Sequence, residues 1–405
     1  MAEAVTTSPL RAIVTYGDDY VQPLIVSALQ SLFPDDTLNL VTEPQASDQG
    51  LATIVETSSS PEPRILHISS YESIDFEYAA SHPRSCLINS YMIRKALIRK
   101  HFLSTTVDHW AAKKPESALA THFKRCEAWE LDYAEFLDDA LVDAFDLRAS
   151  FARNSSRLPT DEQQAEWWIL KPGMSDGGQG IRLFSSMEEL RAIFDEWEEG
   201  QPDSGDEDDG DDEGDGVMAV HLRHFIAQPY IHPPLLLPSD PRKFHIRTYV
   251  LCVGRLAIYV YKPMLALFAA KPYQPPRTHA PNDTASFLTN TCLQPSSPPD
   301  SVQPFWTLNL PHASLDAIFG QICAVTADVF RAAAGVMPVH FQPLGNAFEV
   351  FGLDFLVDHR GKPWLLEVNS FPDFARTGGS LDTLVWLVPV WSRSKRDDIK
   401  LGLTY

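Results

Sequence analysis

The strongest constraint on the fold is a pair of apolar runs within residues 347–371 that are separated only by the short stretch HRGK. Runs of this length, rich in Val, Leu and Phe and joined by a short turn with glycine, are typical of a β-hairpin. A two-residue loop at Arg360 and Gly361 would place Asp354 directly opposite Glu367. Two carboxylates would then face each other across the hairpin.

The same register places Gly352 opposite Asn369. Because side chains alternate along a strand, Asn369 shares the face of Asp354 and Glu367, whereas Leu366 is expected on the opposite, buried face. Two carboxylates and an amide oxygen are hard ligands that suit Mg²⁺. A solvated charge pair is the alternative, although facing like charges cost roughly 0.2–1 kcal/mol unless a cation bridges them.

A second stretch, WWILKPGMSDGGQGIRLF at residues 167–184, combines a buried-looking strand, Lys171 at its end and a glycine-rich loop. Glycine allows backbone N–H groups to approach an anion, and a lysine adds a point charge. The spacing is neither that of a P-loop nor the G-x-G-x-x-G of dinucleotide folds. We interpret the stretch as a cover over nucleotide phosphates; a surface turn with a solvated lysine is the alternative.

Length and composition bound the class of protein. With 405 residues, 44% of them hydrophobic, the chain can bury a sizeable core over two or three subdomains. No run approaches eighteen apolar residues and the N-terminus lacks a secretory pattern, so no membrane association is expected. Five scattered cysteines without C-x-x-C favour reduced thiols, and a cytoplasmic protein is expected.

The charge of the chain is acidic and uneven. A formal net charge of −21 argues against unaided nucleic-acid binding, because phosphate requires a basic face. Between Glu198 and Asp215 there are 11 acidic residues and no Lys or Arg. A segment of that composition cannot bury enough apolar surface to fold, so residues 198–216 are predicted to be a disordered insertion.

Local patterns divide the chain into parts. Strand-like RAIVTY, PRILHIS and SCLINS, with the helical VQPLIVSALQSLF, predict a small N-terminal α/β subdomain. A strand hairpin turning at Gly254 and Arg255 is also predicted, and residues 274–304 are expected to be loop. Apolar spacing predicts helices at residues 90–113, 185–199 and 314–334. The expected parts are 1–85 (N-terminal subdomain), 86–380 (main domain, with a central part 161–275 and a C-terminal part 305–380) and 381–405 (tail).

These motifs, in this order, resemble the tubulin–tyrosine ligase-like family of ATP-grasp ligases over about residues 86–376. The motifs that carry the resemblance are INSYMIRKALIRK, WWILKPGMSDGGQGI, IAQPYIHPPLLL, RKFHIRTYVL, FLTNTCLQ, FEVFGLDFLVD and WLLEVNSFP. The resemblance implies an α/β ATP-grasp fold with ATP and Mg²⁺ as cofactors.

The resemblance also implies roles for individual residues. Lys171 and Arg247 are the expected catalytic groups, and Asp354, Glu367 and Asn369 the expected metal ligands. The expected nucleotide-binding residues, to which we add Leu366, are Lys95, Lys171, Gln228, Pro229, Tyr230, Ile231, Lys243, Arg247, Thr289 and Asn290.

The family's reaction implies a function. ATP phosphorylates a carboxylate to an acyl phosphate, and an amino group then attacks it to form an amide bond. A divergent member would join tyrosine, glutamate or glycine to a protein carboxylate, with tubulin C-terminal tails as possible acceptors. The alternatives are a nucleotide-binding scaffold without ligase activity and a ligase with a non-tubulin acceptor. A kinase-like phosphotransferase is less favoured, because the sequence lacks the kinase signatures.

Two departures from the family pattern concern the acceptor chemistry. His245 stands where the family's K-F-D-I-R pattern has an acidic residue, and Leu267 stands where an arginine is usual. Lys262 and Lys271 flank the second position. ATP binding is therefore better supported by the sequence than acceptor chemistry.

Overall fold

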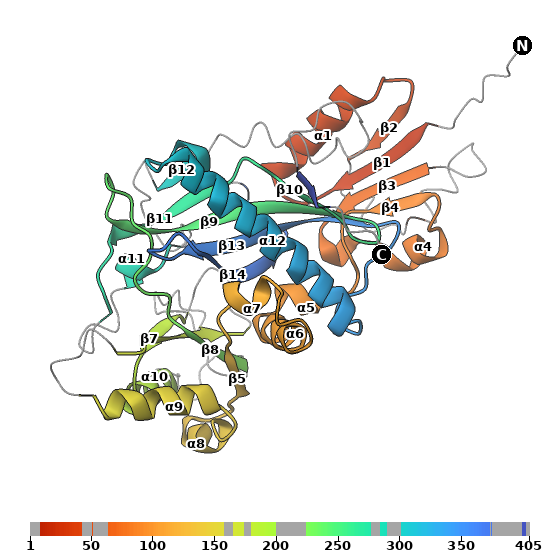
Figure 1. Cartoon of the computed structure of the whole chain (residues 1–405). Coiled ribbons are helices and arrows are strands. Elements are labelled where there is room, and N and C mark those ends of the chain that lie inside the picture. Colours follow the sequence, from red (N-terminus) through yellow and green to blue (C-terminus); the bar gives the residue numbers. More distant parts are fainter. Residues whose placement is uncertain are drawn as a thin grey trace, which may run out of the picture.

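The computed structural model describes residues 9–42, 51, 64–157, 165–173, 180–199, 224–276, 284–289, 301–372, 374 and 399–401. These residues form three lobes, each built around its own β-sheet (Figure 1). The predicted α/β class is confirmed, and the sheets differ in kind: one is parallel and two are largely antiparallel.

The N-terminal lobe is an open parallel sheet in the order β2-β1-β3-β4. Asp18 stabilises the start of its first helix, since Oδ1 accepts the N–H groups of Tyr20 (2.9 Å) and Val21 (2.7 Å). The last strand lies just beyond residue 85, so this sheet does not stop at the expected boundary. Its elements are β1 (Leu10–Thr15), α1 (Val21–Leu32), β2 (Leu38–Val41), β3 (Arg64–Ser69), η1 (Tyr71–Ser73), α4 (Phe76–Ser81) and β4 (Cys86–Ile88).

The central lobe is a small antiparallel sheet in the order β5-β8-β6-β7 with helices on one face (Figure 1). Trp168 and Leu170 of β6 pack into the helical core, whereas Ile169 and Lys171 alternate onto the opposite face. Its elements are β5 (Glu127–Glu130), η2 (Ala134–Phe136), α8 (Leu137–Ala140), α9 (Phe145–Ser155), β6 (Trp168–Pro172), β7 (Arg182–Phe184), α10 (Met187–Glu199) and β8 (His224–Pro229).

The third lobe is a seven-stranded sheet centred on β9, which pairs with β10, β11 and β13. The strand hairpin predicted near Gly254 is confirmed as the β9–β10 connection. The elements are β9 (Arg242–Val253), β10 (Ala257–Val260), β11 (Leu265–Pro272), α11 (Thr284–Phe287), β12 (Val302–Pro304), η6 (Phe305–Thr307), α12 (His312–Val336), β13 (Phe348–Val357), β14 (Pro363–Ser370) and β15 (Ile399–Leu401).

Helix α12 crosses one face of the large sheet (Figure 1). It confirms the helix predicted at 314–334, extended by two residues at each end. Among the described helices it alone is long and apolar enough to cross a membrane, and half of its most apolar window is buried inside the protein. Ile322, Val325 and Val329 lie in the main hydrophobic core, so packing on the sheet accounts for its apolar character.

Residues 90–113 do not form one helix, as the sequence predicts, but two. Arg99, extended at φ −100° and ψ 120°, separates α5 (Lys95–Ile98) from α6 (Lys100–Lys113). The Ala96 N–H donates to the His340 carbonyl (2.9 Å), and Arg94 pairs with Glu349 at 2.9 Å. These contacts with distant segments hold the chain before α6 in place of a continuous helical ladder.

The turn between β13 and β14 contains three residues rather than the predicted two. The Asp358 N–H donates to the Lys362 carbonyl (3.0 Å) and the Gly361 N–H to the Asp358 carbonyl (2.9 Å). Gly361 has a φ of 80°, which glycine adopts without strain. Val357 consequently pairs with Pro363, one residue away from the predicted register.

Three other expectations meet the structure only in part. Residues 274–304 are not all loop, since they contain α11 and β12. Residues 381–405 are not all tail, because Ile399–Leu401 pairs with β10 as β15. Of the predicted disordered insertion at 198–216, Glu198 and Glu199 belong to α10, whereas its remaining residues lie outside the described part of the chain.

Gly173 is predicted to be essential for packing β6 against β8. A Cβ on Gly173 would lie 2.9 Å from the His224 backbone oxygen, so Gly173→Ala must displace a strand and should cost about 1–3 kcal/mol. In Gly320→Ala the new Cβ meets nothing within 4 Å and should stabilise α12 by about 0.5–1 kcal/mol. Differential scanning calorimetry should show opposite Tm shifts; shifts of equal sign would contradict the packing described here.

Candidate functional site

A cleft of about 880 Å³, including the open space at its mouth, lies between the central lobe and the large sheet. Residues of both lobes line it, together with Lys100 at the start of α6. Its lining residues are Lys100, Ile169, Lys171, Ile181, Gln228, Pro229, Tyr230, Ile231, Lys243, His245, Phe287, Leu288, Thr289, Asp354, Leu356, Leu366, Glu367 and Asn369.

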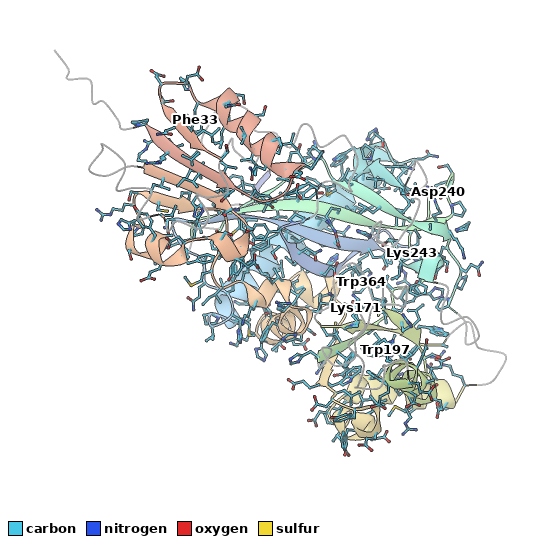
Figure 2. The ribbon with its side chains drawn as sticks, turned by 180° about the vertical axis from the view of Figure 1, so that it is seen from behind. Phe33, Lys171, Trp197, Asp240, Lys243 and Trp364 are labelled. Carbon is cyan, nitrogen blue, oxygen red and sulfur yellow. The ribbon has the colours of Figure 1, made fainter. Side chains whose placement is uncertain are left out.

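Two lysines enter the cleft from different lobes. Figure 2 shows Lys171 on the central lobe and Lys243 above it on the large sheet. Lys171 Nζ donates to Gln228 Oε1 at 2.8 Å, and Lys243 Nζ donates to Tyr230 Oη at 3.1 Å. Both side chains are more than nine-tenths buried, so the cleft holds positive charge away from water.

Burial lowers the pKa of both lysines. It lowers the pKa of Lys171 from its usual value, and together with the nearby charge of Lys171 it lowers the pKa of Lys243 to about 7. A buried cation without enough negative charge beside it is unfavourable. The pair is therefore suited to an anionic ligand that restores the charged form.

An apolar slot adjoins the lysines. Gln228 and Pro229 end β8, and Tyr230 and Ile231 follow it, with the Tyr230 N–H donating to the Trp167 carbonyl at 2.8 Å. The side chains that complete the slot include Ile169, Ile181, Leu356 and Leu366. Apolar walls beside backbone groups are what a flat heteroaromatic ring requires. The predicted nucleotide-binding residues 228–231, here called the hinge, therefore lie together in the cleft.

A β-bulge at Leu366 corrects the register error of the hairpin turn. Phe355 pairs with Leu365, and the next pair is Asp354 with Glu367, which leaves Leu366 as the extra residue. Asp354 and Glu367 therefore face each other as predicted. The expectation that Leu366 faces the buried side is wrong, because the bulge turns Leu366 and Glu367, neighbours in sequence, toward the same cleft.

The three predicted metal ligands lie together in the cleft. Asn369 Nδ2 is 3.3 Å from Asp354 Oδ2 and 3.3 Å from Glu367 Oε1. Burial alone would raise the pKa of Glu367, but Lys100, Lys171 and Arg247 together lower it to about 2. The carboxylate is therefore ionised at neutral pH, as a metal ligand must be.

Arg247 lies on the strand beside the carboxylates rather than on the lining of the cleft. It is opposite Asp354 in the β9–β13 register, and its Nη2 donates to Asp354 Oδ2 at 3.0 Å. Gly352 provides the space, since a Cβ there would lie 3.4 Å from Arg247 Cδ and 3.0 Å from Pro372 Cβ. Arg247 thus orients Asp354 and places a permanent positive charge next to the cleft.

His245 occupies the position where the family pattern has an acidic residue. Its Nδ1 is 2.6 Å from Thr289 Oγ1, and its Nε2, 3.7 Å from Asp354 Oδ1, has no hydrogen-bond partner within the described residues. Burial lowers the pKa of His245. Thr289 is therefore placed as predicted, whereas Asn290 lies outside the described residues.

The predicted role of Lys95 is not supported by its position. Its side chain is exposed at the start of α5, and it is absent from the lining of the cleft among the described residues. Lys100, at the start of α6, lines the cleft instead, with Nζ 3.8 Å from Glu367 Oε2. Lys100 belongs to the same basic stretch as Lys95. The prediction of one unbroken helix through residues 90–113 did not show which of the two lysines faces the cleft.

The residues present fit a magnesium nucleotide. Two carboxylates and one amide leave other coordination positions to phosphate and water, which is the usual arrangement for Mg²⁺. Asn369 would need its oxygen turned toward the ion; amide orientation is an assignment that a bound cation would decide. Lys100, Lys171 and Lys243 line the cleft where polyphosphate would contact them, and Arg247, paired with Asp354, lies beside it. These features define the class as ATP-grasp.

Comparison with known proteins assigns the family. The model of the Tubulin-tyrosine ligase family matches residues 87–385, and the chain belongs to this family.

Two fungal relatives are similar over most of the chain. Probable tubulin--tyrosine ligase C12B10.04 of Schizosaccharomyces pombe is 41% identical over 94% of this chain and 89% of its own length. Probable tubulin--tyrosine ligase PBY1 of Saccharomyces cerevisiae is 42% identical over 91% of this chain, which spans about half (49%) of that longer protein.

A solved structure has the same fold. The crystal structure of the C-terminal domain of K. lactis Pby1, titled an ATP-grasp enzyme interacting with the mRNA decapping enzyme Dcp2, aligns with a TM-score of 0.69 and 32% identity. The alignment covers 98% of this chain and 100% of that one. The ATP-grasp fold expected from the motifs is confirmed.

Glu367 is predicted to be required for metal-dependent ATP turnover. In Glu367→Gln the cleft loses one anionic ligand, while the fold should persist because the side chain is a quarter exposed and its ion-pair partner among the described residues, Lys100, is 3.8 Å away. ADP release over a Mg²⁺ titration should be abolished, with Tm nearly unchanged. Glu130→Gln, at an exposed site in another lobe, is the matched control. Full turnover in Glu367→Gln would contradict the metal assignment.

Asp354 is predicted to behave differently. Its removal leaves Arg247 buried without its carboxylate, so Asp354→Ala should lose activity and about 3–5 kcal/mol of stability. Urea unfolding monitored by tryptophan fluorescence measures the loss. A stability equal to that of the unmodified protein would show that the ion pair does not support the sheet.

ATP binding is predicted to take up protons above pH 7. Because the pKa of Lys243 is lowered to about 7, its amine is largely neutral at pH 8, and a bound phosphate would raise that pKa and reprotonate it. Calorimetry at pH 8 in buffers of different ionisation enthalpy should give uptake of up to about one proton from this group. Lys243→Arg, which stays charged, should reduce it; an enthalpy independent of buffer would contradict the lowered pKa.

Proposed function

We propose that the protein is an ATP- and Mg²⁺-dependent ligase that joins an amino acid to a polypeptide carboxylate through an acyl phosphate. The observation that carries the proposal is the convergence in one cleft of Lys171, Lys243, the hinge at 228–231 and the carboxylate pair of the hairpin. Each group comes from a different strand, and together they form a site for Mg·ATP with charge at the transferred phosphate.

Residues at different positions in the cleft bind different parts of Mg·ATP. Lys171 and Lys243 bind phosphate oxygens from opposite sides of the cleft, and the slot at Tyr230 and Ile231 holds the adenine. Asp354, Glu367 and Asn369 would hold Mg²⁺, which when bound neutralises charge on the transferred phosphate. Arg247 keeps Asp354 oriented, and its fixed charge favours binding of the reacting carboxylate.

The identity of the substrates is proposed from the family. Tyrosine, glutamate and glycine are the candidate amino acids, and an acidic tubulin tail is a candidate acceptor, since the fungal relatives are named probable tubulin--tyrosine ligases. We propose a cytoplasmic location. The K. lactis structure, titled as interacting with Dcp2, suggests a protein of the mRNA decapping machinery as a further partner.

A nucleotide-binding scaffold without ligase activity is the second candidate, and Leu267 favours it. Leu267 lies directly opposite His245 in the β9–β11 register and is only 3% exposed, packed in a cluster with Tyr249 and Leu265. Lys262 and Lys271 are exposed, and neither lines the described cleft. Loss of one preorganised cation commonly costs about 10²–10³ in rate.

The deciding experiment measures products rather than binding. Purified protein, Mg·ATP and labelled tyrosine, glutamate or glycine are incubated with detyrosinated tubulin and with cell-derived peptides, and mass spectrometry detects added residues. Lys171→Met is the matched inactive control. The ligase proposal predicts ADP release and an added amino acid that both require Lys171. ATP binding without any added residue would support the scaffold, and absence of ATP binding would contradict both.

A further inference from the structure

A second cavity, of about 490 Å³, lies between the N-terminal lobe and the large sheet. Val21 and Ile25 of α1 line one side, and Phe348 and Val350 of β13 line the other. The cleft between the central lobe and the large sheet shares none of these residues. The cavity therefore has no role in the nucleotide chemistry described above.

The cavity lies where an open parallel sheet usually binds its ligand. The chain passes from β1 outward to β2 and then to β3 on the other side of β1, so the strand order reverses between β1 and β3. Crevices outside the carboxyl ends of strands at such a point are ligand sites. Tyr16 follows β1, Ile68 is near the end of β3 and Asn89 follows β4, and all three line the cavity.

One wall is held in a strained backbone conformation. Phe371, directly after β14, has a φ of 47°, in the left-handed region that non-glycine residues rarely adopt. Such strain costs on the order of 1–3 kcal/mol and tends to occur at functional sites. The ring of Phe371 lies 5.9 Å from that of Tyr16, so the strained residue closes the cavity between two lobes.

The one acidic residue in the described lining, Glu349, already has partners within the protein. Glu349 is 2% exposed; its Oε2 accepts the Tyr91 N–H at 3.0 Å and its Oε1 lies 2.9 Å from Arg94 Nε. Arg94 in turn stacks on the Tyr71 ring at 3.7 Å. Arg94 neutralises this carboxylate, and burial raises the pKa of Glu349 to about 7. The described lining holds no lysine or arginine, so an acidic side chain would be buried there without a counter-charge, whereas an apolar or aromatic one is accommodated.

The cavity and the carboxylate pair lie on the same face of β13. Val350 and Asp354 are four residues apart, which is about 13 Å at the usual rise of a strand. Of the residues between them, Gly352 is the one that shares their face. Pro372, which lines the cavity, and Arg247 pack against Gly352, so a peptide that joins the two sites would run beside them rather than directly on β13. An extended peptide of about four residues therefore spans the distance.

We propose that this cavity binds an apolar or aromatic side chain of the acceptor polypeptide, about four residues from the carboxylate that reacts. The inference rests on the proposed ligase function and specifies its acceptor. It predicts an acceptor that is not uniformly acidic, since a glutamate at the anchoring position would be buried without a counter-charge among the described lining residues.

The test uses acetylated ten-residue Gly/Ser peptides that end in glutamate, with one Phe placed at each preceding position. Affinity is measured by fluorescence anisotropy with Mg²⁺ and a non-hydrolysable ATP analogue. Turnover is measured by ADP release with ATP and a mixture of tyrosine, glutamate and glycine, whose amino groups displace phosphate from the acyl phosphate. Phe three to five residues before the glutamate should lower Kd about tenfold to a hundredfold relative to Ala, as expected for burial of one large apolar side chain. Glutamate there should not.

Two variants test the cavity itself. Val350→Phe fills it from a half-buried strand position, and Phe371→Asn removes a wall while tolerating the left-handed backbone. Both should abolish the positional preference. Val41→Phe makes the same change at a half-buried position on β2 that lines neither cavity, and it should retain the preference. Thermal unfolding of all three shows that each is folded.

The outcomes separate this inference from the ligase proposal. Position-specific binding without ADP release would retain the cavity assignment and contradict the ligase function. ADP release without a positional preference, a preference for glutamate at the anchoring position, or a preference unaffected by both variants would overturn the cavity assignment. It would also be overturned if Val350→Phe weakened only the binding of a free aromatic amino acid, because the cavity would then hold the donor.

Discussion

The ion pair between Arg247 and Asp354 is the interaction on which the site depends most. The two residues are directly opposite in the β9–β13 register, and both are largely buried. A buried pair is stable only when its geometry and further hydrogen bonds are good, and here Asn369 also donates to Asp354. Gly352 leaves the volume that the guanidinium fills.

That pair fixes the strands that carry the other charges. β9 brings Lys243 and His245 to the cleft, and β14 brings Glu367 and Asn369 next to Asp354. The central lobe then adds Lys171 from the other side. Because the lysines are buried with lowered pKa values, the charge arrangement is complete only with an anion present, and this requirement connects the fold to a polyphosphate substrate.

Local patterns predicted much of this site. Alternation along a strand was enough to place Asp354, Glu367 and Asn369 on one face, and the apolar run before Lys171 placed that lysine near the end of a strand. The glycine-rich loop predicted to cover the phosphates lies mostly outside the described residues, at 174–179. The hairpin register was right for an incorrect reason: a longer turn shifts it by one residue, and the bulge at Leu366 shifts it back. Neither irregularity has a strong local sequence signal.

Features that depend on distant contacts were not predictable from local patterns. The break at Arg99, which brings Lys100 rather than Lys95 to the cleft, follows contacts with residues near 340 and 349. The second cavity is lined by both Tyr16 and Phe371, which are more than three hundred positions apart in the sequence. Periodicity describes one element at a time, whereas both features arise where elements meet.

The most direct test of the central claim is a crystal structure of the protein with Mg²⁺ and a non-hydrolysable ATP analogue. The adenine is predicted between Ile169 and the hinge at 228–231, with phosphates contacting Lys171 and Lys243. The metal is predicted at Asp354, Glu367 and Asn369, with the Asn369 oxygen turned toward it. A nucleotide bound elsewhere, or a metal that does not contact both carboxylates, would contradict the account.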